Sequence, residues 1–341
     1  MKQEERESDS FSLNVLRAKA LVAAASASNS PHSIASITAH AYLFVKEADL
    51  CFWKACHEPA DLLSLFNHTA SLAFYSISRI THTSGPMLMR VIRLPGIHHD
   101  ANCTLIIGKA STLMVDVGTS WYQLLIHERV IGQLGEENTP SAILLTSRRY
   151  NHCGGAAFVS EQFSGIPIHI ESSAASALSI GDFASTGARR FDSEMPKTST
   201  EPVVDSQIWD LGDCQVEAIA LPGHCQDGMG YWIPEKRIAA VGSVIPMLDK
   251  PSRWDMMGGC LPDLADSVEL LLELELKMLI PGFGEAISGK AEVRKVLKQH
   301  LAFFELCIEA GGEAPAHWQR PAQTANYLTP RTPWKQIREE E

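Results

Sequence analysis

The sequence lacks any sustained run of lysine and arginine. Its 341 residues carry 29 Lys and Arg against 40 Asp and Glu, which gives a formal net charge of -11. Proteins that hold a phosphate backbone do so with clustered cations, so this charge pattern argues against nucleic acid as a partner. A small molecule or another protein is the better expectation.

Long apolar runs are also missing. No stretch approaches the roughly 18 apolar residues that a membrane span needs, and the opening Met-Lys-Gln-Glu-Glu-Arg-Glu places acids where a secretory signal would be positively charged. The eight cysteines include no Cys-x-x-Cys pair, which is typical of reduced thiols. We therefore expect neither export nor membrane insertion, and a cytoplasmic location.

The sequence divides into three regions of different amino-acid composition. Residues 1–85 are rich in Ala, Ser, Leu and His, with helix-like spacing over 13–25 and 60–74, and predict a helical or partly disordered appendage. Residues 86–312 carry short β-branched runs broken by Gly and Pro, which predict the main domain. Residues 313–341, rich in Pro and Trp, predict a tail that wraps the surface of that domain.

Strand and helix patterns alternate within the main domain. Apolar residues at helical spacing predict helices over residues 121–134, 154–163, 264–274 and 290–310. Short apolar and β-branched runs predict strands over residues 87–94, 103–108, 111–115, 141–146, 166–171, 207–211, 215–221, 229–233, 237–241 and 278–280. This order predicts a layered α/β domain with sheets in the centre and helices outside.

Four loops at the ends of predicted strands carry turn motifs. In chain order they are Asp116-Val117-Gly118-Thr119; Thr146-Ser147-Arg148-Arg149-Tyr150-Asn151-His152-Cys153-Gly154-Gly155; Pro222-Gly223-His224-Cys225-Gln226-Asp227-Gly228, followed by a strand that ends at Gly242-Ser243; and Pro281-Gly282-Phe283-Gly284. Each motif alone is a common kind of turn. Four of them in this order are a specific indication of fold, and a weaker one of chemistry.

Together these loops resemble the signature loops of the metallo-β-lactamase superfamily, whose members include hydroxyacylglutathione hydrolases, ribonuclease Z-like nucleases and lactonases. The resemblance implies a four-layer αββα sandwich. In the family, the aspartate of the first loop braces a histidine of the metal site, a role that would fall to Asp116. The second loop of the family reads Thr-His-x-His-x-Asp-His-x-Gly-Gly and supplies ligands to two metal ions.

Most of those ligands are replaced in this sequence. The family's seven ligand positions fall on Ser147, Arg149, Asn151, His152, His224, Ser243 and Phe283. Serine and a neutral amide are poor zinc ligands, phenylalanine cannot coordinate, and the guanidinium of Arg149 is positive where a cation should sit. Ser243 also removes the carboxylate that bridges two metal ions. Only His152 and His224 keep ligand chemistry.

Two functions follow from this resemblance. The favoured hypothesis is a catalytically impaired homologue that acts as a binding module for a small molecule or protein, with Arg149 holding a carboxylate or phosphate. The alternative is an active hydrolase of an ester or thioester that uses zinc or another divalent metal at a rebuilt single-metal site on His152 and His224. A third ligand would then come from Cys153, Cys225 or the loop His98-His99-Asp100.

A serine and histidine pair is a further arrangement to test. Ser147 or Ser243 could act with His152 or His224, although the sequence supplies no recognisable oxyanion hole. The distance between a hydroxyl and an imidazole decides whether such a pair exists.

Overall fold

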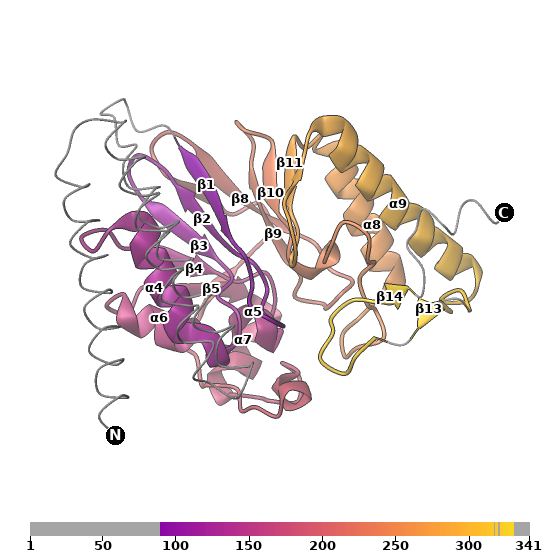
Figure 1. The fold of residues 1–341 in the computed structure, drawn as a ribbon, viewed down its shortest axis with the longest axis horizontal. Coiled ribbons are helices and arrows are strands. Elements are labelled where there is room, and N and C mark those ends of the chain that lie inside the picture. The colour runs from indigo at the N-terminus through magenta and orange to yellow at the C-terminus, as the bar shows by residue number, and fades with distance from the viewer. Residues whose placement is uncertain (1–88, 317, 320, 331–341) are drawn as a thin grey trace, which may run out of the picture. The chain divides into compact units, whose positions relative to one another are not determined.

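The computed structural model describes residues 89–316, 318–319 and 321–330. The predicted appendage and its helices over 13–25 and 60–74 lie outside the described residues. In the described part, two six-stranded sheets pack face to face and helices cover their outer faces (Figure 1). The predicted four-layer αββα architecture is confirmed.

The first sheet has the strand order β1-β2-β3-β4-β5-β6. Its strands are β1 (Arg90–Leu94), β2 (Cys103–Ile107), β3 (Thr112–Val115), β4 (Ala142–Leu144), β5 (Ile168–Glu171) and β6 (Glu201–Val203). The pairs β1·β2 and β2·β3 are antiparallel, and the pairs from β3 to β6 are parallel. The carboxyl ends of β3, β4 and β5 therefore lie along one edge of the sheet.

The second sheet has the order β12-β11-β10-β9-β8-β7. Its strands are β7 (Ile208–Asp210), β8 (Gln215–Ala220), β9 (Met229–Ile233), β10 (Ile238–Ala240), β11 (Met278–Ile280) and β12 (Ile287–Ser288). Only β10 and β11 are parallel to each other. The carboxyl ends of these two strands lie side by side.

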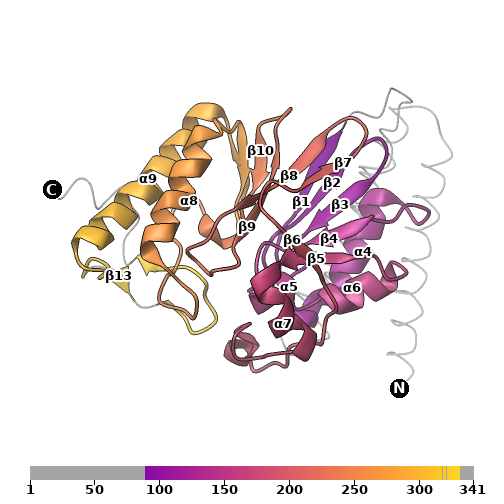
Figure 2. The same ribbon diagram turned by 180° about the vertical axis from the view of Figure 1, so that it is seen from behind.

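Helices cover the outer face of each sheet, as Figures 1 and 2 show from opposite sides. The first sheet carries α4 (Gln123–Leu134), α6 (Ala156–Gln162) and α7 (Ser172–Ile180), and the second carries α8 (Leu261–Glu273) and α9 (Lys290–Glu309). Shorter turns complete the fold: α5 (Tyr150–Cys153), η2 (Ser120–Tyr122), η3 (Ala188–Phe191) and η4 (Gly242–Val244). No helix of the described residues is long and apolar enough to cross a membrane.

Apolar strands explain the layering. All five residues of β2 are buried, because one face of this strand packs on the helices and the other on the second sheet. Three apolar clusters result, one between the sheets and one under each helical layer. Each fully buried leucine or isoleucine in them contributes about 1.5–3 kcal/mol of transfer free energy.

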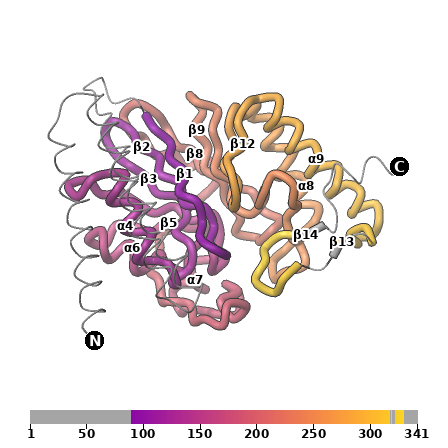
Figure 3. The backbone as a smooth tube through the Cα atoms, viewed as in Figure 1, coloured from indigo at the N-terminus to yellow at the C-terminus, as the bar shows by residue number. Residues whose placement is uncertain are grey.

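Several elements differ from the sequence prediction. The helix predicted over 154–163 is preceded by the separate turn α5, and the structure adds α7, β6, β12 and the tail strands β13 (Trp318–Gln319) and β14 (Thr329–Pro330). The tail strands lie beside the ends of α8 and α9 (Figure 3). Trp318 stacks on Phe303 with ring centroids 4.3 Å apart, so the described tail contributes to the core as well as to the surface.

Candidate functional site

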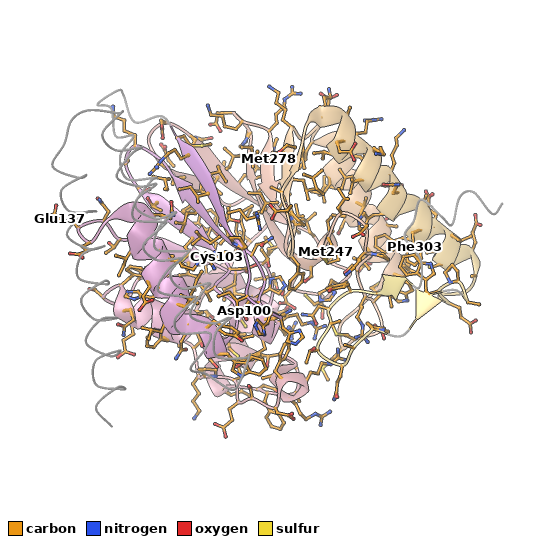
Figure 4. All side chains as sticks on the ribbon, viewed as in Figure 1. Asp100, Cys103, Glu137, Met247, Met278 and Phe303 are labelled. Carbon is orange, nitrogen blue, oxygen red and sulfur yellow. The ribbon has the colours of Figure 1, made fainter. Side chains whose placement is uncertain are left out.

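The loops that carry the four motifs meet on one side of the domain. They follow the carboxyl ends of β3, β4, β8, β10 and β11, and backbone hydrogen bonds connect them, including Val117 N to His152 O at 2.9 Å and Val241 N to Ile280 O at 3.1 Å. Figure 4 shows the side chains of this region, with Asp100 from the loop before β2 and Met247 from the loop after η4 labelled. Ligand sites in α/β folds commonly lie at such strand ends.

Asp116 is the centre of a buried hydrogen-bond network. It ends β3 with a positive φ of 54°, and its carboxylate accepts from the backbone N of Thr146 at 2.8 Å and from Thr146 Oγ1 at 2.6 Å. His152 Nδ1 lies 2.7 Å from Asp116 Oδ2. Asp116 therefore braces a histidine of the loop after β4, which is the role that the resemblance implies.

His152 joins that network to the second sheet. Its ring is fully buried, and its Nε2 lies 2.7 Å from the hydroxyl of Ser243 at the start of η4. The Asp116 carboxylate can only accept, so Nδ1 is the donor to it, and a ring that carries its proton on Nδ1 accepts the Ser243 hydroxyl at Nε2. Asp116, His152 and Ser243 thus form a continuous chain of hydrogen bonds.

His224 occupies a different environment. Its Nδ1 lies 3.1 Å from both the carbonyl oxygen of Arg253 and the hydroxyl of Ser252. Its Nε2 is buried and has no hydrogen-bond partner among the described residues. Burial, and then the positive charge of Arg149, hold the pKa of His224 well below its usual value, so the ring is neutral.

Arg149 lies inside the site with 4% of its surface exposed. Its guanidinium donates to the carbonyl oxygens of Met257 at 2.6 Å, Ser185 at 3.3 Å and His224 at 3.4 Å. The buried Nε has no partner in the described part of the chain. The positively charged side chain of Arg149 therefore connects three loops that meet at this site.

Two neighbours of Arg149 are engaged elsewhere. Arg148 forms an ion pair with the buried Asp227, with Nε and Oδ1 2.7 Å apart, and the hydroxyl of Ser147 accepts from the backbone N of Arg149 at 3.3 Å. Of the two candidate serines, the structure brings Ser243 to hydrogen-bond distance of an imidazole.

The tail covers this site. Asn326 is 3% exposed and its side-chain nitrogen donates to Asn151 Oδ1. Asn151 Nδ2 in turn donates to the carbonyl of His99 at 3.2 Å. Phe283 packs edge-on against His152, with ring centroids 5.6 Å apart, and against Tyr327 at 5.8 Å. Two former ligand positions, Asn151 and Phe283, thus contact the tail.

Sequence reasoning did not find the tail contacts or the hydrogen bond between Ser252 and His224. Tyr327 and Asn326 are more than 40 residues beyond the last motif, and a single Ser or Asn in a loop has no local pattern that marks it as part of a site. Thr146 lies within the second motif, and its position shortly after the buried strand β4 was the available signal.

The proposed replacement ligands make separate contacts within the protein. Cys153 Sγ donates to the Arg148 carbonyl at 3.1 Å, and burial raises the pKa of the Cys153 and Cys225 thiols well above its usual value. The His98 ring packs at a tilt against Tyr122, with ring centroids 5.5 Å apart, and the His99 ring packs edge-on against Phe191 at 5.9 Å. No three His, Cys, Asp or Glu side chains of the described residues converge on one point that could hold a metal ion.

The donor set therefore does not fit the two-metal centre that the resemblance implies. His152 has both ring nitrogens in hydrogen bonds, and the fixed positive charge of Arg149 faces His224. A second cation at this place would be repelled, and carboxylates to offset that repulsion are missing from the former ligand positions.

Comparisons with known proteins place these observations in a family. A model of the metallo-beta-lactamase superfamily matches residues 97–282. No curated protein matches the chain in sequence.

Solved structures show the same fold at low identity. A metallo-beta-lactamase family protein from Thermus thermophilus has a TM-score of 0.54 and 17% identity, over 66% of this chain and 82% of its own. The BLEG-1 B3 metallo-beta-lactamase has a TM-score of 0.51 and 21% identity, over 60% and 95%. A stereoselective inverting sec-alkylsulfatase from Pseudomonas sp. has a TM-score of 0.52 and 13% identity, over 64% and 41%.

Proposed function

The chain belongs to the metallo-beta-lactamase superfamily, and on that premise we propose that it is a member whose two-metal centre has been replaced and that it acts as a binding protein for an anionic small molecule. The observation that carries this proposal is the guanidinium of Arg149, buried among the site loops with its Nε unpartnered among the described residues.

Uncompensated positive charge supports an anionic ligand. Arg148 pairs with Asp227, and Arg253 pairs with Asp255 through two contacts of 2.7 and 2.6 Å. Arg149 and Arg190 make no ion pair with a carboxylate in the described part of the chain. Both lie close enough to repel each other, and this repulsion, after burial and the charge of Arg253, lowers the pKa of Arg190.

Burying an arginine without a counter-charge costs several kcal/mol, because carbonyl dipoles replace only part of its hydration. A carboxylate or phosphate placed against Arg149 would supply that charge and could accept paired hydrogen bonds from a guanidinium. This is the physical reason for an anionic ligand in a protein whose net charge is -11.

One observation favours the alternative, a hydrolase with a rebuilt single-metal site. His224 Nε2 is a neutral, buried imidazole nitrogen without a hydrogen-bond partner among the described residues, and such an atom is suited to bind a metal ion. A site on His152 and His224 would require His152 to release Ser243 and a third ligand to move in. The contacts of Arg149 make this the weaker candidate.

Thermal unfolding in inorganic phosphate tests the binding proposal. At a phosphate concentration ten times the dissociation constant, the protein should gain about 1.4 kcal/mol and its Tm should rise by about 2–4 °C. The Arg149→Gln variant should lose that increase relative to its own phosphate-free Tm, because it lacks the cation and the paired donors.

Arg237→Gln is the matched control. Arg237 is exposed and pairs with Glu275 at 3.1 Å, so the same change of charge there should leave the phosphate effect intact. Equal phosphate responses in wild type and Arg149→Gln would contradict an anion site at Arg149, and chloride at the same ionic strength separates specific binding from a general salt effect.

A further inference from the structure

Asp116, His152 and Ser243 form a chain of hydrogen bonds that binding of an anion at Arg149 does not require. The hydroxyl of Ser243 lies 2.7 Å from His152 Nε2, and His152 Nδ1 lies 2.7 Å from the carboxylate of Asp116. A hydroxyl on one imidazole nitrogen and a carboxylate on the other is the arrangement that activates a serine, whichever fold carries it.

Hydrogen bonds from neighbouring residues hold Asp116 and Ser243 in position. Thr146 donates to Asp116 through its backbone N at 2.8 Å and its hydroxyl at 2.6 Å, which fixes the carboxylate toward the ring. The carbonyl of Ser243 accepts from the hydroxyl of Ser252 at 2.6 Å. The two sheets thereby present base and hydroxyl to each other from strands that lie far apart in the sequence.

Ser243 stands on a sharp turn directly after a strand. β10 ends at Ala240, and Gly242, the first residue of η4, has a φ of +53°. A side chain at Gly242 would place its Cβ 2.5 Å from Thr146 Oγ1, so glycine allows the turn that brings Ser243 to His152. Nucleophilic serines are often carried on tight turns between a strand and a helix, which set the hydroxyl apart from the sheet.

We propose that Ser243 is a nucleophile activated by His152, and that the site transfers or hydrolyses the acyl group of an ester that bears a carboxylate or phosphate. The inference rests on the proposed function because Arg149 would hold the anionic part of that ester. Asp116 is a positioning residue in this scheme, since it acts on the reaction only through His152.

The proposed reaction uses only Ser243, His152 and water. Ser243 Oγ forms a bond to the acyl carbon as its proton passes to His152 Nε2, and the bond from the acyl carbon to the leaving alkoxide breaks as His152 returns the proton to it. Water then attacks the acyl carbon and gives its proton to His152. The bond to Ser243 Oγ breaks, and the acid is released with Ser243 and His152 restored.

The tail packs against residues that surround Ser243. Ser243 is 4% exposed, Asn326 donates to Asn151 beside His152, and Tyr327 packs on Phe283, which packs on His152. A substrate would reach the hydroxyl only after this segment moves. The Asn326→Ala variant removes the hydrogen bond between the tail and Asn151 and should make Ser243 easier to reach.

Covalent labelling of the full-length protein with a fluorophosphonate probe, in excess chelator, tests the proposal. The probe forms a bond between phosphorus and an activated serine oxygen and releases fluoride, and mass spectrometry of the proteolysed protein identifies the serine. We expect one adduct on Ser243, none there in Ser243→Ala, and faster labelling in Asn326→Ala. His152→Gln should slow labelling by at least about 100-fold, since a general base contributes that much or more.

Ser267→Ala is the matched control, because Ser267 is similarly buried and its hydroxyl donates to the Pro222 carbonyl at 2.7 Å. It should label as wild type does. Circular dichroism confirms that each variant is folded; if His152→Gln unfolds, the contrast between Ser243→Ala and Ser267→Ala carries the test.

Absence of an adduct on Ser243 in both wild type and folded Asn326→Ala would overturn the inference and leave Ser243 as a structural partner of His152. That result is distinct from failure of the proposed function. The phosphate-dependent rise in Tm depends on Arg149, so it should persist in Ser243→Ala whether or not the serine reacts.

Discussion

At the residue scale, Arg149 connects the site loops from a position that the resemblance assigns to a metal ligand. A metal ion ties loops together by attracting lone pairs, and the guanidinium does the same with directed N–H donors to three backbone carbonyls. The difference is that the arginine is part of the chain. We therefore expect these loops to fold without a metal ion from solution.

Gly223 lies where an added side chain would collide with α8. Its φ is +119°, and a Cβ there would lie 2.4 Å from the backbone N of Leu264 at the start of α8. We expect Gly223→Ala to lower the free energy of unfolding by about 3 kcal/mol or more, from backbone strain plus collision. Urea unfolding measures the change.

Gly165→Ala is the control that separates those two causes. Gly165 also has a positive φ, +77°, but nothing lies within 4 Å of an added Cβ. Gly165→Ala should lower the free energy of unfolding by about 1 kcal/mol, from backbone strain alone. Equal losses at both positions would show that α8 yields to the added methyl group.

Sequence reasoning found most residues of the site but not their connections. Asp116, His152 and Ser243 were all named from motifs, and the motif order indicated that they share one region. The hydrogen bond between His152 and Ser243 joins residues 91 positions apart in the sequence. The distance between these two side chains depends on how the two sheets pack. Local patterns cannot supply that distance, so the serine and histidine pair remained one arrangement among several.

At the element scale, strongly periodic segments were predicted well and polar ones were not. The helix predicted over 290–310 is α9, Lys290–Glu309. By contrast, α7 was not predicted because four of its nine residues are serines, whose hydroxyls compete for backbone hydrogen bonds and lower helix propensity. Glu171 at its start accepts from the backbone N of Ser173 at 2.8 Å and compensates in part.

α9 carries a pH-dependent contribution to stability. His300 on this helix is fully buried, its Nε2 lies 3.1 Å from the Met247 carbonyl, and burial lowers its pKa to about 4. Between that pKa and the usual value of 6.5 the unfolded chain binds the extra proton. This contribution is therefore complete above about pH 6.5 and is lost as the pH falls toward 4.

His300→Gln should flatten that dependence, because glutamine can donate to the same carbonyl without taking up a proton. Between pH 7 and 4.5, wild type should lose about 2–3 kcal/mol more than the variant. Urea unfolding at several pH values measures this difference. His99→Gln, at an exposed ring, should follow wild type, and parallel losses in wild type and His300→Gln would assign the acid sensitivity to other groups.

At the scale of the whole molecule, the chain has the fold of the family but other residue types at most of the positions that the resemblance assigns to metal ligands. The sheets, the helical layers and the glycine turns are those of the metallo-beta-lactamase superfamily, whereas the seven ligand positions hold an arginine, a phenylalanine, two serines, an asparagine and two histidines. The inner side of the site is built from protein hydrogen bonds, and its outer side is closed by the tail. Such a site suits an anion and a reactive hydroxyl better than a pair of cations.

The most direct test of this account is elemental analysis of the full-length protein, with zinc, iron and manganese counted per chain before and after mild chelation. A variant with five ligands restored together, Ser147→His, Arg149→His, Asn151→Asp, Ser243→Asp and Phe283→His, is the positive control and should take up zinc. The wild-type protein should hold less than about 0.1 metal ion per chain. About one tightly held ion per wild-type chain would contradict it, and would favour a hydrolase with a rebuilt site on His152 and His224.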